Sequence, residues 1–135
     1  MKSLIAKVVL PIILIFLFTY ASAQQNQTES RNAEFYFNRG IAYANKGQLD
    51  QAISDYNKAI EIDPRFADAY TNRGTAYCYK GQYDQAISDY TNAIELDPTD
   101  AAAYYNRGRA YHLKREYEKS RGNVNKAQSL GYQAP

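Results

Sequence analysis

Polar and apolar residues alternate with a helical period along most of the chain, and the pattern predicts pairs of helices. A first helical face is formed by residues three or four positions apart, namely Tyr36, Arg39, Gly40 and Tyr43. A second helical pattern runs through residues 49–60. Gly47 separates the two, and Asp63 and Pro64 end the second, because the residue before a proline is kept out of the helical conformation. We therefore predict a helix-turn-helix unit.

This unit returns after thirty-four residues. Residues 33–66 and 67–100 are identical at about two-thirds of their positions, and residues 101–134 form a third, looser copy. A fixed period of this size is typical of stacked repeat proteins, in which each unit buries its apolar face on the next. We predict that such a domain occupies residues 33–135.

The repeated Tyr-x-x-Arg-Gly-x-x-Tyr motif, followed by Ala, Tyr, Ala and Pro, resembles the tetratricopeptide repeat (TPR) family. The resemblance covers residues 33–134. It implies an exported protein of bacterial type with three repeats. It implies an all-α fold, a right-handed solenoid of three stacked helix-turn-helix repeats. It also implies that the first helix of each repeat lines a concave face where partners bind.

The third copy departs from the other two in its second helix. It carries Arg115 at the glycine position, Ser120 at the alanine position and Val124 at the aromatic position. Its second helix is otherwise polar, which suits a cap on the end of the stack. We expect Gly131 to end this helix in the left-handed conformation.

The first 23 residues have the features of a signal peptide. Lys2 and Lys7 precede an apolar run, and Ala21-Ser22-Ala23 matches the small-residue pattern of a cleavage site. We predict cleavage after Ala23 and a periplasmic or secreted protein with no membrane insertion after cleavage; a retained anchor is the alternative. Residues 24–32 are polar, lack helical periodicity and are interpreted as a linker.

Charge and cysteine content narrow the function further. The formal net charge is +2, with acidic residues concentrated before Asp100 and basic residues after it. Opposite charges at the two ends would attract a second copy head to tail, and export makes a nucleic-acid partner unexpected. Cys78 is the only cysteine, so stability must come from packing rather than from an internal disulfide.

No catalytic motif stands out. Cys78 and His112 hold equivalent places in successive repeats, so a thiol–imidazole pair is conceivable, but coincidence is the simpler interpretation. Asp50, Asp84 and their repeat companions Asp55 and Asp89 are interpreted as charges near helix starts or as solvated outer-face charges. We predict no enzyme activity, no metal site and no cofactor.

The resemblance instead implies a peptide-binding groove. Asn38, Asn72 and Asn106 precede each Arg-Gly pair, and an amide offers an extended peptide both a donor and an acceptor; a purely structural role is the alternative. Phe37, Tyr79 and Tyr105 would form an aromatic strip. The full predicted groove comprises Phe37, Asn38, Ile41, Asn45, Thr71, Asn72, Thr75, Tyr79, Tyr105, Asn106, Arg109 and His112.

One known specificity is excluded. Family members that bind the acidic tails of cytosolic chaperones use a clamp of lysines, an arginine and asparagines. The corresponding positions here are Phe37, Ile41, Asn72, Ala102 and Asn106, and only Asn72 matches. Carboxylates held there without cations would be unpaired and costly to bury.

We predict a non-catalytic module that binds a protein or peptide in its groove; the alternative is a structural protein that self-assembles, as a homo-oligomer, through its open ends.

Overall fold

The computed structural model describes residues 1–133, without the side chains of residues 4 and 5, and this part of the chain contains six helices. The last residues of the predicted third repeat and domain, 134 and 135, lie outside the described range. The helices are α1 (Lys2–Asn45), α2 (Leu49–Ile62), α3 (Ala67–Tyr79), α4 (Tyr83–Leu96), α5 (Ala101–Leu113) and α6 (Tyr117–Ser129).

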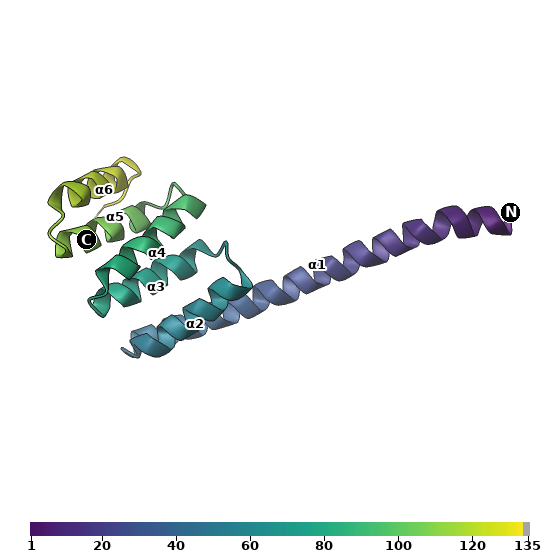
Figure 1. Ribbon diagram of the computed structural model, residues 1–135, viewed down its shortest axis with the longest axis horizontal. Coiled ribbons are helices and arrows are strands. Elements are labelled where there is room, and N and C mark those ends of the chain that lie inside the picture. The colour runs from purple at the N-terminus through teal and green to yellow at the C-terminus, as the bar shows by residue number, and fades with distance from the viewer. Residues whose placement is uncertain (134–135) are drawn as a thin grey trace.

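The helices form three antiparallel hairpins stacked side by side (Figure 1). The C-terminal part of α1 pairs with α2, α3 pairs with α4, and α5 pairs with α6. Each hairpin also packs on the next, because α2 contacts α3 and α4 contacts α5. The predicted all-α solenoid of three repeats is confirmed.

The turns follow the sequence signals. Gly47 and Gly81 adopt φ values of 73° and 75° between the helices of the first two hairpins. Gly131 follows α6 with φ 89°, as predicted. In the third hairpin the same left-handed turn is made by Arg115, with φ 64°. A side chain is disfavoured in this conformation, so the third turn is strained relative to the other two.

The core consists mainly of alanine and tyrosine. Ala52 and Ala59 of α2 are fully buried, and the Tyr56 ring between them is 1% exposed. Gly40 of α1 faces this ring, since a Cβ built there would lie 2.6 Å from Tyr56 Cε1. The glycine of the repeat motif therefore makes room for the tyrosine of the partner helix.

Helix α1 differs from the expected arrangement at the N-terminus. The polar residues 24–32 are helical and continue directly into the first repeat, instead of forming a non-helical linker. Neither glycine nor proline occurs between Pro11 and Gly40, so nothing in the sequence interrupts the backbone hydrogen bonds. Within the described residues, this helix also has an apolar segment long enough to cross a membrane, a property shared by signal sequences. Cleavage after Ala23 stays a prediction.

Candidate functional site

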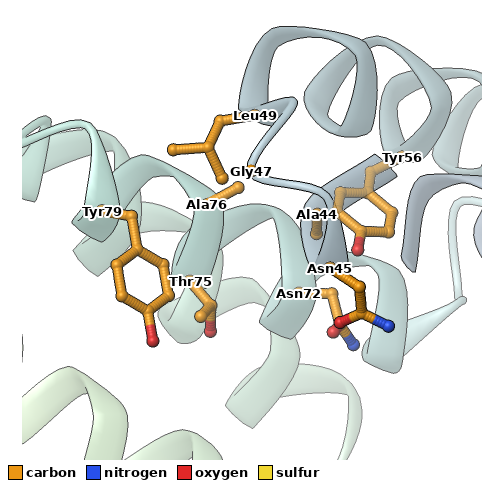
Figure 2. A pocket seen from close by; sticks show the side chains of 9 residues that line it. All are labelled: Ala44, Asn45, Gly47, Leu49, Tyr56, Asn72, Thr75, Ala76 and Tyr79. Carbon is orange, nitrogen blue, oxygen red and sulfur yellow. The ribbon is translucent and has the colours of Figure 1, made fainter. Parts of the chain in front are cut away.

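Two adjoining cavities open along the faces of α1, α3 and α5. The larger has a volume of about 580 Å³ (Figure 2). Its walls come from the end of α1, the following turn, α2 and α3: Ala44, Asn45, Gly47, Leu49, Tyr56, Asn72, Thr75, Ala76 and Tyr79.

The smaller cavity, of about 100 Å³, continues the first toward α5. It shares Thr75 and Tyr79 with the larger cavity, so the two form one groove across the three repeats. The remaining lining residues are Cys78, Tyr90, Asn106, Arg109 and Leu113. We call the two cavities together the groove.

The groove offers polar groups over an apolar floor. In Figure 2 the polar ends of Asn45, Asn72, Thr75 and Tyr79 point to the same side of the helices. The Tyr79 side chain is 75% exposed between the two cavities, where it presents both a ring face and a hydroxyl group. Amides and hydroxyls pair with the main chain of an extended peptide, while an exposed ring holds its apolar side chains.

Half of the predicted groove residues line it: Asn45, Asn72, Thr75, Tyr79, Asn106 and Arg109. Of the three residues of the expected aromatic strip, only Tyr79 lines the groove. The Phe37 ring packs 4.7 Å from that of Phe66, and the Tyr105 ring stacks 4.4 Å from that of Tyr132. Four further predicted positions line neither cavity: Asn38, Ile41, Thr71 and His112.

Sequence reasoning missed the second-helix contribution to the groove. Leu49 and Tyr56 line it from α2 and Tyr90 lines it from α4, and none of the three was among the predicted groove residues. The Thr75 hydroxyl lies 3.1 Å from that of Tyr90, so the inner wall is tied to the core. The available signal was that the two tyrosines hold the same position in successive repeats, where each faces a glycine of the first helix.

Cys78 does not form a reactive pair with His112. The thiol lies in the smaller cavity, where burial raises its pKa, and its hydrogen bond with Tyr90 only partly offsets this. The His112 ring packs instead against Tyr117, with 5.3 Å between ring centroids. Thiolates rather than thiols act as nucleophiles, so this environment disfavours thiol chemistry. Within residues 1–133, no group of three or more metal-binding side chains is positioned around a common centre.

The interpretation of Asp55 and Asp89 as solvated or helix-start charges is wrong, because each is 3% exposed. Arg39 donates to Asp55 through Nε and Nη2, at 2.6 and 2.8 Å. Arg73 pairs with Asp89 in the same way, at 2.8 and 2.6 Å, and these hydrogen bonds raise the pKa of Arg73. We call these two arginine–aspartate pairs the arginine clamps. Their sequence signal was the recurring offset of sixteen residues between the arginine and the aspartate.

The same offset holds in the third repeat with an amide in place of the carboxylate. Arg107 Nε donates to Asn123 Oδ1 at 2.8 Å. Each repeat therefore ties its two helices together with one arginine.

Family models together match residues 33–130. Models described as tetratricopeptide repeat match residues 33–66, 55–88 and 101–130, and one described as TPR repeat matches residues 74–114. The chain belongs to the tetratricopeptide repeat family. A curated relative, the uncharacterized protein MJ0572 of Methanocaldococcus jannaschii, is 41% identical over 34 residues, which are 25% of this chain and 40% of the relative.

Solved structures show the same architecture. The second TPR of Spaghetti (RPAP3) bound to the HSP90 peptide SRMEEVD has a TM-score of 0.76 and 26% identity, covering 79% of this chain and 98% of that one. The TPR2B domain of yeast Sti1 in complex with pHsp70 has a TM-score of 0.74 and 29% identity, covering 75% and 81%. The Arabidopsis OM64 TPR domain has a TM-score of 0.75 and 26% identity, covering 76% and 85%.

Proposed function

We propose that this protein is a non-catalytic adaptor that holds a segment of a partner protein in the groove, in the periplasm or outside the cell. The observation that carries the proposal is the groove itself, in which amides, hydroxyls and one exposed aromatic ring lie along successive repeats. Similar TPR domains are seen with bound peptides of HSP90 and with pHsp70. The signal-like N-terminus supports the exported location.

The partner need not share the acidic tail of those peptides. Arg109 is the only cationic side chain lining the groove as defined by the two cavities. The positions of the chaperone-tail clamp other than Asn72 hold Phe37, Ile41, Ala102 and Asn106 instead. We therefore propose a ligand held mainly by main-chain hydrogen bonds and by one or more apolar side chains beside Tyr79.

Affinity capture tests the proposal. The bait is the chain from Gln24 onward, because every residue described as buried lies at Ala33 or later. An extract of the compartment that holds the protein is passed over this bait and over an Asn72→Ala/Tyr79→Ala variant. The control is Ser54→Ala/Ser88→Ala, which changes exposed side chains outside the groove.

We expect a polypeptide that is retained by the parent and the control and is lost from the groove variant. All variants must first show the helical circular dichroism of the parent. If the same polypeptides bind the parent and the groove variant equally, the groove is not the binding site. If nothing but the bait itself is recovered, the adaptor proposal fails.

A further inference from the structure

Each junction between repeats is crossed by a lysine–aspartate pair. Lys80 Nζ of α3 donates to Asp50 Oδ1 of α2. Lys114 Nζ of α5 donates to Asp84 Oδ1 of α4 at 2.6 Å, which raises the pKa of Lys114. Both pairs join residues thirty apart, so the second junction repeats the first.

An arginine crosses each junction as well. Arg73 Nη1 donates to Asn57 Oδ1 of the preceding repeat at 2.7 Å. Arg107 Nη1 donates to Thr91 Oγ1 at 3.0 Å, again over sixteen residues. We call the lysine–aspartate and arginine–amide or arginine–hydroxyl contacts together the junction ladder.

The first repeat carries the donor residues of a further junction, and the last repeat carries the acceptor residues. At the first repeat, Lys46 and Arg39 occupy the donor positions but have no preceding helix. The Arg39 side chain is accordingly 41% exposed, against 18% for Arg73. At the last repeat, Glu118 and Asn125 of α6 occupy the acceptor positions. The Glu118 side chain is 85% exposed, much as Asp50 and Asp84 are in their own pairs, and its Oε1 lies 3.4 Å from Nη2 of Arg121 in the same helix.

We propose that the outer face of α6 docks on the outer face of α1 of a second copy of this chain, extending the junction ladder between molecules. Glu118 of one copy meets Lys46 of the next, and Asn125 meets Arg39. This surface is separate from the groove, so the inference stands independently of the proposed adaptor function.

The outer face of α6 has fewer apolar side chains than the helix faces that meet inside the molecule. Inside the molecule, Ile87 packs against the cluster around Ala110, and Ile94 packs against Ala103. The positions equivalent to these isoleucines in α6 are Arg121 and Gln128, and both are exposed. The intermolecular junction therefore lacks most of the apolar contact and depends on charge, which makes it weak and sensitive to salt.

The arrangement is also head to tail rather than two-fold. The two docking faces differ, so each added copy leaves one free face of each kind. The average mass should then keep rising with protein concentration, without levelling off at a dimer. Phe35, which is 57% exposed, holds the position of the buried Ala69 and Ala103, so its larger side chain lies within this face and favours a splayed rather than a tight junction.

Sedimentation equilibrium on the chain from Gln24 tests the proposal with charge-swap variants. Lys46→Glu and Glu118→Lys each place like charges at the junction, and the double variant restores opposite charges. Arg65→Glu, in the exposed turn between α2 and α3, is the matched charge-reversal control. Each protein is measured at about 0.02 M and about 0.5 M salt, where exposed charges are respectively weakly and strongly screened.

We expect concentration-dependent association at low salt that is lost at high salt. Each single reversal should weaken association by about ten-fold or more, since like charges then face each other, and the double variant should recover the parent value. The control should associate as the parent does. Circular dichroism must show that all variants keep the parent fold.

Two results would overturn the proposal. If the protein stays monomeric at every concentration, a second copy does not dock on the outer face of α1, and the occupant of that face would be a helix of another protein. Association that is unchanged by the single reversals, or is not recovered in the double variant, would place the contact elsewhere on the molecule.

Discussion

At the scale of single residues, Arg115 is the clearest departure from the repeat pattern. It adopts φ 64° where the other repeats have Gly47 and Gly81. A non-glycine residue in the left-handed region costs about 1–2 kcal/mol. We therefore expect Arg115→Gly to raise the free energy of unfolding by about 1 kcal/mol in urea denaturation. Arg115→Ala keeps the backbone strain and should give no such gain; an equal gain from both would assign the effect to the arginine side chain.

A second residue-scale prediction concerns pH. Burial raises the pKa of Tyr56 to about 12, from a usual value of 10. The neutral hydroxyl is thus favoured in the folded state, while the unfolded chain loses its proton near pH 10. This contribution to stability is complete below about pH 10 and is lost as the pH rises toward 12. Tyr56→Phe should flatten the fall in the denaturation midpoint over this range, and an unchanged slope would exclude Tyr56 as its source.

At the scale of the helix pair, the arginine clamps hold each hairpin closed. Removing one partner of a buried ion pair leaves the other without compensation, at a cost of about 3–5 kcal/mol. Because the Arg73 side chain is 18% exposed, we expect Asp89→Ala to cost about 3 kcal/mol in chemical denaturation. Asp89→Asn should cost less, since Asn123 accepts from Arg107 in the third repeat.

The exposed ion pair between Asp84 and Lys114 provides the control. Asp84 is 80% exposed in its contact with Lys114, so Asp84→Ala should cost less than about 1 kcal/mol. If the two alanine variants were equally destabilised, burial of the clamp would not explain its contribution.

The helical glycines divide into two kinds. A Cβ at Gly40 would lie 2.6 Å from the buried Tyr56 ring, whereas a Cβ at Gly122 in α6 would meet nothing within 4 Å. We expect Gly40→Ala to destabilise the fold by about 1–3 kcal/mol through overpacking. Gly122→Ala should stabilise it by about 1 kcal/mol through helix propensity. Thermal unfolding of the two variants gives the comparison, and opposite signs are the result that the packing requires.

Sequence reasoning predicted the helix pairs well because their signals are local. Gly47, Pro64 and the spacing of tyrosine and alanine each act within one turn or one helix face. The clamps and half of the groove depend on contacts between helices, which a pattern along one helix does not show. Phe37 pairs with Phe66, between α2 and α3, and Tyr105 pairs with Tyr132, after α6, so the aromatic strip expected from helix position alone is shorter.

At the scale of the whole molecule, the last hairpin is the weakest part of the stack. Helix α4 buries five residues, including Tyr90 and Ile94, whereas α6 buries only Ser120 and Ala127. Stability in repeat proteins is close to a sum over units and their junctions, so a poorly buried end opens first. We expect backbone amides of α6 to exchange with deuterium faster than those of α4 in native-state hydrogen exchange.

Ser120→Ala provides the matching variant, because it restores the alanine of the earlier repeats and should slow exchange in α6. Faster exchange in α2 than in α6 would contradict the expected order of opening within the repeats.

The constant offsets of the clamps and of the junction ladder have a consequence for the length of the protein. The hydrogen bonds that join one repeat to the next are made by the same positions at the same separation. A duplicated copy of residues 67–100, inserted after Asp100, would therefore find the partners of these hydrogen bonds already in place. The chain could gain or lose whole units during evolution, with a longer or shorter groove, while the residues at its two ends stayed the same.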